Sequence, residues 1–308
     1  MSLFALAVSA VGWAAAPVFI RGLADAYDPY TQALTRYAAA AVPLLLLSLV
    51  FYRADLWKVF GMASGMLGVS LVNAAQQCAW TVACYRTTAT LAQLVAKLSI
   101  VFVILFSYFL FREERAVIKS RSYLVGTVAS FAGCVLVLCK DPATLMPQFD
   151  LATVLLLLVA VLWAVYVVWS RHLVTDVHPV PMFTVLALYT TAMFGVLALL
   201  FGDPMTIARA GWRANTLTAA SGVICIALSH SFFLYAQKRL GSALCSSIIL
   251  LNPLITYAMA LVFWSDERMV ATQWVGTVIL ILGTFLVTWA GQRAQAGKTA
   301  IAAGQAGE

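Results

Sequence analysis

The sequence predicts an all-α polytopic membrane protein, with ten transmembrane helices arranged as two inverted five-helix repeats and both termini in the cytoplasm. Three observations predict this fold: an apolar composition, hydrophobic segments of membrane-spanning length, and an internal repeat. Of the 308 residues, 63% are apolar and 10% are charged, whereas soluble domains carry roughly 25% charged residues. A soluble fold would lack polar surface, which argues against a cytosolic enzyme, a secreted domain or a nucleic-acid-binding protein.

Ten hydrophobic segments are long enough to cross a membrane. A helix needs ~20 residues to cross the ~30 Å of hydrocarbon in a bilayer. The segments that pass this test are 3–21, 30–52, 58–82, 87–111, 121–139, 150–171, 180–201, 214–236, 243–264 and 270–291. The loops between them are too short to fold alone, and the Ala-, Gly- and Gln-rich tail 292–308 is predicted to be a disordered cytoplasmic segment.

The two halves of the chain repeat each other at an offset of about 150 residues. Seven of the fourteen residues in 10–23 are identical to their counterparts, among them Trp13, which matches Trp163. We therefore predict one five-helix repeat in 1–145 and a second in 146–291. Because five spans per half is an odd number, the halves insert with opposite orientation, as in many secondary transporters.

Basic residues set the orientation. With both termini inside, eleven of the nineteen Lys and Arg residues fall in inner segments and six in outer loops, which agrees with the positive-inside rule. The same retention of basic residues explains the net charge of +7 without a polyanionic partner. The six cysteines lie in apolar runs without metal-ligand or redox spacing, so no metal or cofactor is predicted.

No acidic residue lies at mid-bilayer depth, because all twelve fall in loops, at span edges or in the tail. Proton- and sodium-driven carriers commonly use a buried carboxylate as a relay or ligand. The absence of one favours a facilitated carrier, although His230, the only histidine at depth, remains able to take a proton. His230 matches Gln77 when the halves are aligned with an offset of 153, and a structural histidine bonded to a neighbouring helix is the alternative.

The third span carries a polar face. Asn73, Gln76, Gln77 and Trp80 stand at i, i+3, i+4 and i+7, which places three amides and an indole on one side of a helix. One interpretation is hydrogen bonding between helices, and the other is the wall of a water-filled cavity. Three amides on one face favour the cavity.

Two cations lie inside predicted spans. Lys97 is near the middle of span four, too deep to reach the interface easily, and Gln93 lies one turn earlier on the same face. Lys97 is either held by backbone carbonyls, or uncharged, or a partner for a substrate carboxylate. Arg36, nearer the outer end of span two, is predicted to be an edge or gate residue.

Deep aromatic residues provide candidate walls for a flat, apolar ligand. Trp13 in span one and Trp163 in span six lie well below the headgroup region, where membrane Trp is usually found, and Tyr166 shares a face with Trp163. Core packing is the alternative for each of them.

Prolines interrupt three spans. Pro17 and Pro43 lie in spans one and two, and Asn252-Pro253 lies in span nine. A proline frees the carbonyl one turn back and bends the helix, so Pro17, Pro43 and Pro253 are candidate hinges and Asn252 is a candidate binding residue. The glycine pairs Gly126/Gly133 and Gly276/Gly283 instead suit close packing of helices.

Two acidic-Arg turns carry a resemblance to a known family. Glu113-Glu114-Arg115 closes span four and Asp266-Glu267-Arg268 closes span nine, and each precedes a helix that carries Val-Gly-Thr-Val. With Asn252-Pro253, these residues make the chain resemble the EamA-domain members of the drug/metabolite transporter superfamily over 1–291. In one departure, Ser99-Ile100 in span four stands where span nine has Asn252-Pro253, so the halves need not bend alike.

Within that superfamily the chain looks most like the aromatic amino acid exporters of the YddG type, on the strength of the deep Trp13, Trp80 and Trp163 and the amide face of span three. The resemblance implies a bacterial inner-membrane exporter of aromatic and other neutral amino acids. It also implies a central cavity formed by spans one to four and six to nine.

The residues and the resemblance together predict a carrier for small neutral metabolites, above all aromatic and other neutral amino acids, that works by alternating access. The alternatives are a multidrug or other metabolite carrier of the same fold, and a channel or lipid-handling protein. No paired buried carboxylates, HExxH motif or nucleophile constellation points to an enzyme. The sequence leaves the preferred substrate and the oligomeric state open.

Overall fold

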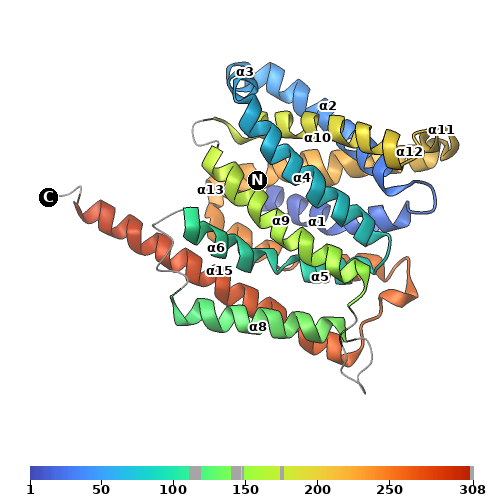
Figure 1. The fold of residues 1–308 in the computed structure, drawn as a ribbon. Coiled ribbons are helices and arrows are strands. Elements are labelled where there is room, and N and C mark those ends of the chain that lie inside the picture. The colour runs from blue at the N-terminus through green and yellow to red at the C-terminus, as the bar shows by residue number, and fades with distance from the viewer. Residues whose placement is uncertain (111–118, 140–146, 148, 174–176, 306–308) are drawn as a thin grey trace.

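The computed structural model describes all residues except 111–118, 140–146, 148, 174–176 and 306–308. In the described residues every regular element is a helix (Figure 1). The first half contains α1 (Ser2–Gly22), α2 (Pro29–Phe51), α3 (Arg53–Gly61), α4 (Ala63–Cys84), α5 (Ala89–Ala96), α6 (Ser99–Leu110) and α8 (Arg121–Leu138). The second half contains α9 (Leu151–Leu173), α10 (Pro179–Phe201), α11 (Thr206–Arg209), α12 (Gly211–Ser221), the π-helical segment η2 (Gly222–Leu228), α13 (Ser229–Ile249), α14 (Asn252–Ala260), the 3₁₀ turn η3 (Ser265–Glu267) and α15 (Ala271–Gln305).

The described residues contain eight helices that are long and apolar enough to cross a membrane, or nine if the bent pair α3–α4 forms one span. The predicted count of ten is therefore not reproduced. The axes of α3 and α4 differ by 88°, so span three starts with a separate short helix. Predicted span nine, 243–264, is divided between the end of α13 and α14, because the helix breaks just before Asn252-Pro253.

Two further segments differ from the sequence prediction. The expected loop between spans eight and nine lies inside α13, and α15 continues to Gln305 where a disordered tail was predicted from residue 292. The tail contains no proline and is rich in Ala and Gln, which are good helix formers, so the helix meets no strong stop. The predicted repeat boundary at 145/146 and the turn Glu113-Glu114-Arg115 lie outside the described residues.

The repeat is visible in the helices themselves. Both α2 and α10 begin with proline and end with phenylalanine, and their bounds differ by 150 residues at each end. The two helices pack against each other with Tyr37 beside Phe194 and with the Ser48 and Thr184 hydroxyls 2.7 Å apart. Since the residue number rises along one helix as it falls along the other, these equivalent helices run antiparallel.

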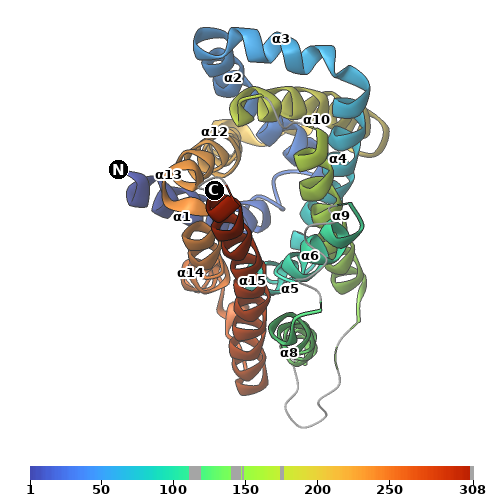
Figure 2. The ribbon, with the colours of Figure 1, turned by 90° about the vertical axis from the view of Figure 1, so that its left-hand side faces the viewer.

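A second pair of equivalent helices, α8 and α15, packs in the same manner at one edge of the bundle, opposite α2, α3 and α10 (Figure 2). A Cβ atom added to Gly126 would lie 2.7 Å from the carbonyl oxygen of Gly283, and one added to Gly133 would lie 2.7 Å from that of Gly276. The glycines therefore permit backbone-to-backbone contact, as predicted. The pairing is antiparallel and reciprocal, as inverted repeats require.

Large apolar side chains also cover the outside of the helices. At least 70% of the surface is exposed in each of four such residues, Val50, Phe51, Val128 and Leu199. Soluble monomers rarely expose apolar surface on this scale. Hydrocarbon is the solvent that such a surface suits.

Candidate functional site

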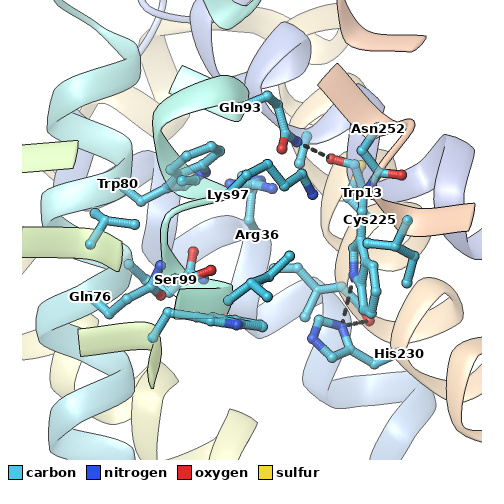
Figure 3. A pocket seen from close by; sticks show the side chains of 18 of the residues that line it. Trp13, Arg36, Gln76, Trp80, Gln93, Lys97, Ser99, Cys225, His230 and Asn252 are labelled. Carbon is cyan, nitrogen blue, oxygen red and sulfur yellow. Dashed lines mark hydrogen bonds between the residues drawn. The ribbon is translucent and has the colours of Figure 1, made fainter. Parts of the chain in front are cut away.

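A cavity of about 230 Å³ lies at the centre of the bundle, between helices of the two halves. Figure 3 shows Trp80 and Gln76 on one side, Trp13, His230 and Asn252 on the other, and Lys97 between them. We call this cavity the chamber. The described residues that line it are Trp13, Ala16, Arg36, Tyr37, Gln76, Gln77, Trp80, Gln93, Ala96, Lys97, Ser99, Ile100, Val159, Trp163, Cys225, Ile226, His230, Ile249 and Asn252.

The structure brings together eight of the ten residues predicted to bind substrate: Trp13, Gln76, Gln77, Trp80, Lys97, Trp163, His230 and Asn252. They come from both halves, and helices α1, α4, α9, α13 and α14 and the α5–α6 connection supply them. The helical spacing on span three and the depth of the indoles were the useful signals.

Asn73 and Tyr166 do not line the chamber. The Asn73 side-chain amide donates hydrogen bonds to the Tyr37 hydroxyl at 3.2 Å and to the Thr190 hydroxyl at 3.1 Å, so it joins α4 to α2 and α10. This is the interhelical role that was the alternative for span three. Tyr166 is buried behind the chamber wall, with its ring centroid 5.4 Å from that of Trp163.

Proline 17 explains one wall of the chamber. Pro17 has no N–H group, so the Trp13 carbonyl one turn earlier loses its donor within α1. The side-chain amide of Gln93 on α5 donates to that carbonyl at 2.9 Å. The next carbonyl, of Ala14, accepts a 2.8 Å hydrogen bond from Thr256 on α14. The part of α1 before Pro17 is thereby tied to a half-helix of each repeat.

His230 is fixed by its neighbours. Its Nδ1 lies 2.8 Å from the Ile226 carbonyl oxygen and 3.4 Å from the Trp13 indole nitrogen. One nitrogen cannot donate to the carbonyl and accept from the indole at once, so we assign the shorter contact as the hydrogen bond, with Nδ1 as donor. The ring also stacks on Phe183 with centroids 4.2 Å apart. These contacts match the structural alternative, on a residue that still faces the chamber.

The α5–α6 connection presents Lys97 at a break in span four. The backbone N–H groups of Lys97 and Leu98 bond to the carbonyls three residues back, those of Leu94 and Val95, instead of four residues back as in an α-helix. The Lys97 ammonium has no hydrogen bond or ion pair with any residue that the structure describes. It therefore has free donors toward the chamber.

Arg36, which was predicted to be an edge or gate residue of span two, also lines the chamber. Its side chain is buried, and its Nε donates to the Ser221 hydroxyl at 3.0 Å. The backbone of η2 approaches Arg36 closely, because a Cβ atom at Gly222 would lie only 2.1 Å from the Arg36 carbonyl oxygen. The position of Arg36 along its own helix could not predict this contact, because the contact is with a π-helical segment of the other half.

The chamber also contains two free hydrogen-bond acceptors. Gln76 and Asn252 are 4% and 2% exposed, and their side-chain oxygens Oε1 and Oδ1 have no hydrogen-bond partner in the described part of the chain. A buried polar atom without a partner is costly. Such acceptors suit a ligand or water that carries N–H or O–H donors.

One end of the α5 helix is anchored by a buried carboxylate. Glu267 accepts hydrogen bonds from the backbone N–H groups of Ala89 and Thr90 and from the Thr90 hydroxyl, and it pairs with Arg21 at 2.6 Å. The carboxylate therefore caps α5 at its N-terminus, which the helix dipole favours. Eight residues of helix, about 12 Å, separate this anchor from Lys97.

The fold and the chamber define a multi-pass membrane protein with a ligand-sized cavity between two antiparallel repeats. The family model described as "EamA-like transporter family" matches residues 1–139 and again 150–289. The chain thus belongs to the EamA-like transporter family, whose members carry small molecules across membranes.

The fold is shared with a solved structure described only as "Crystal structure of protein". It is 17% identical to this chain, covers 94% of it and 97% of its own length, and superposes with a TM-score of 0.64. No curated protein sequence matches the chain.

Proposed function

We propose that the protein exports small neutral metabolites, above all aromatic and other neutral amino acids, by alternating access across a bacterial inner membrane, with both termini in the cytoplasm. The observation that carries the proposal is the composition of the chamber wall: two cations, three indoles, and two amide residues whose buried oxygens have no partner among the described residues. Each is complementary to one part of an amino acid.

The carboxylate of an amino acid matches the free ammonium of Lys97. Charge-assisted hydrogen bonds of this kind are about twice as strong as neutral ones. The amino acid's own ammonium matches Gln76 Oε1 and Asn252 Oδ1, the two acceptors without a partner in the described residues. An aromatic side chain would lie against Trp13, Trp80 or Trp163.

The size and charge of the chamber disfavour the multidrug alternative. Its volume of about 230 Å³ is below the ~300–1,000 Å³ of pockets that hold drug-sized ligands. A drug cation would also meet Lys97 and Arg36 with no acid among the described lining residues. Both properties favour a small ligand that carries a carboxylate.

Alternating access needs parts that move against each other. We propose that the breaks at α5–α6 and α13–α14, with Pro17, Pro43 and Pro253, let one half rock against the other around the chamber. The lack of an acidic residue at mid-bilayer depth supports facilitated rather than proton-driven movement. His230 is the residue through which a proton-linked alternative would act.

Counterflow in proteoliposomes tests the proposal. Vesicles preloaded with unlabelled phenylalanine should accumulate labelled phenylalanine transiently, and an imposed proton gradient should not make the accumulation last. A channel would give no counterflow, and exclusive movement of a drug cation such as tetraphenylphosphonium would replace the proposed substrate. Empty vesicles and vesicles with the Lys97→Ala variant are the controls.

A further inference from the structure

The chamber has an unbalanced charge. Lys97 and Arg36 both line it, and none of its described lining residues is acidic. In the whole sequence no acid lies at mid-span depth. Positive charges in a low-dielectric space favour a negative partner, so the chamber attracts negative charge.

Arg36 has the geometry of an anion ligand. Its Nε is used in the hydrogen bond to Ser221, which holds the guanidinium in place. The two terminal nitrogens make no hydrogen bond or ion pair with a residue in the described ranges. A guanidinium cannot be deprotonated in a protein and binds carboxylates through a rigid fork, so the positive charge of Arg36 persists in the chamber.

The buried acid that caps the helix leading to Lys97 is already paired. Glu267 is bound to Arg21, to Thr90 and to the N-terminus of α5, and the length of α5 separates it from Lys97. It balances the charge of Arg21 and not that of the chamber. The two chamber cations therefore depend on the ligand for a counter-charge.

We infer that the chamber prefers net-anionic organic acids, with an apolar body and no ammonium group, to the zwitterionic amino acids that share the same side chain. The inference rests on the proposed function in that the chamber is taken as the transport site. The carboxylate neutralises part of the positive charge that Lys97 and Arg36 bring to the chamber wall, whereas a ligand ammonium adds a third cation to the same space.

The free acceptors do not reverse this preference. Gln76 Oε1 and Asn252 Oδ1 are neutral dipoles, and a water molecule or a ligand hydroxyl supplies their hydrogen bond as well as an ammonium does. A hydroxyl next to the carboxylate is therefore compatible with the chamber, and a positive charge is not required there.

Three probes with the same phenyl ring test the inference: 3-phenylpropionate, which is an anion, phenylalanine, which is a zwitterion, and 2-phenylethylamine, which is a cation. Inhibition of counterflow by each probe is measured on the purified, reconstituted protein. We expect the anion to inhibit at about ten-fold lower concentration than the zwitterion, and the cation not to inhibit. Equal or stronger inhibition by phenylalanine would overturn the inference and leave the proposed function intact.

Labelled 3-phenylpropionate separates the two claims further. If it is carried and phenylalanine is not, the anion preference holds and the amino acid proposal fails; if neither is carried, both fail. In Arg36→Gln, the ratio of the inhibitory concentration of phenylalanine to that of 3-phenylpropionate should fall toward one. In Arg36→Lys, which keeps the charge, most of the original ratio should remain. A preference unchanged in well-folded Arg36→Gln would overturn the role of Arg36. If that variant does not fold, the three-probe comparison on the unaltered protein decides.

Discussion

The two broken helices, one in each repeat, occupy equivalent places and differ in chemistry. Span four breaks at Lys97-Leu98 and the second repeat breaks at Leu250-Leu251, which is the same position at an offset of 153. The second break is followed by Asn252-Pro253, whereas the first has Ser99-Ile100 and no proline. The helix breaks in both halves, although only one carries a proline that explains a break from sequence.

The hydrogen bonds show what the breaks share. Ile100 and Val101 donate to carbonyls three residues back, and so do Leu251 and Leu254. In each half the α-helical pattern gives way to a 3₁₀-like turn beside the chamber. Proline is therefore one way to make this break and not a requirement of the fold.

The comparison teaches how a symmetric fold makes an asymmetric site. The first break brings a cation into the chamber at Lys97, and the second brings a neutral amide at Asn252. Each side chain belongs to the same structural feature of its repeat. The counterpart of Lys97 is the buried Leu250, so equivalent positions of the two repeats differ in both polarity and exposure.

The largest expected effect concerns the anchor of the first half-helix. Glu267→Gln should lower the stability of the protein by about 3 kcal/mol, because it removes a buried charge that pairs with Arg21 and caps α5. Thermal unfolding in detergent measures the loss. Asp266→Asn is the matched control: Asp266 also binds Arg21, but its side chain is 60% exposed, so its loss should cost less than about 1 kcal/mol. Equal losses of stability in the two variants would mean that the cap of α5 does not stabilise the protein.

The second prediction separates the two breaks by function. Lys97→Ala should reduce counterflow by about 10- to 100-fold at unchanged folded yield, since it removes a charged hydrogen bond to the substrate. The equivalent change in the other half, Leu250→Ala, truncates a side chain that is 2% exposed and does not line the described chamber. It should lower folded yield and spare the transport rate of each folded molecule. Unchanged kinetics in Lys97→Ala would make that lysine structural.

The third prediction tests the link between α1 and the first break. Gln93→Ala should cost about 1–2 kcal/mol, because it leaves the Trp13 carbonyl without its donor. In a Pro17→Ala background residue 17 regains an N–H group that can serve this carbonyl, so the same change should cost clearly less. A double-mutant cycle on thermal stability measures the coupling. Additive effects would show that Pro17 is not the reason for the Gln93 contact.

Much of this architecture was predictable from local patterns. Hydrophobic segments predicted most of the helices, and the 150-residue repeat predicted the antiparallel pairs. One helical face of span three predicted Gln76, Gln77 and Trp80 as chamber residues. Helical spacing says which side chains share a face, but it does not say what faces them. Asn73 lies on that same face and meets Tyr37 and Thr190 instead of the chamber.

The features that the sequence did not predict depend on contacts between distant segments. Arg36 is held beside the chamber by α12 and η2, which pack against α2, and Ser221 at the end of α12, 185 residues later, accepts its hydrogen bond. The break at Lys97 has no proline to mark it. In the tail beyond residue 292, composition suggested disorder although no residue there stops a helix that is already formed.

The smallest effect is expected for the proline that distinguishes the two breaks. Pro253 occupies the first turn of α14, where a helix N–H has no partner within the helix and proline is well tolerated. Since the first half breaks without a proline, Pro253→Ala should change stability by less than about 1 kcal/mol and leave the break in place. Amide hydrogen exchange over residues 248–256 measures this, with Pro43→Ala, in an unbroken helix, as the control. Strong new protection across Leu250-Leu251 would mean that proline makes the second break, and that the helices of the two halves break for different physical reasons.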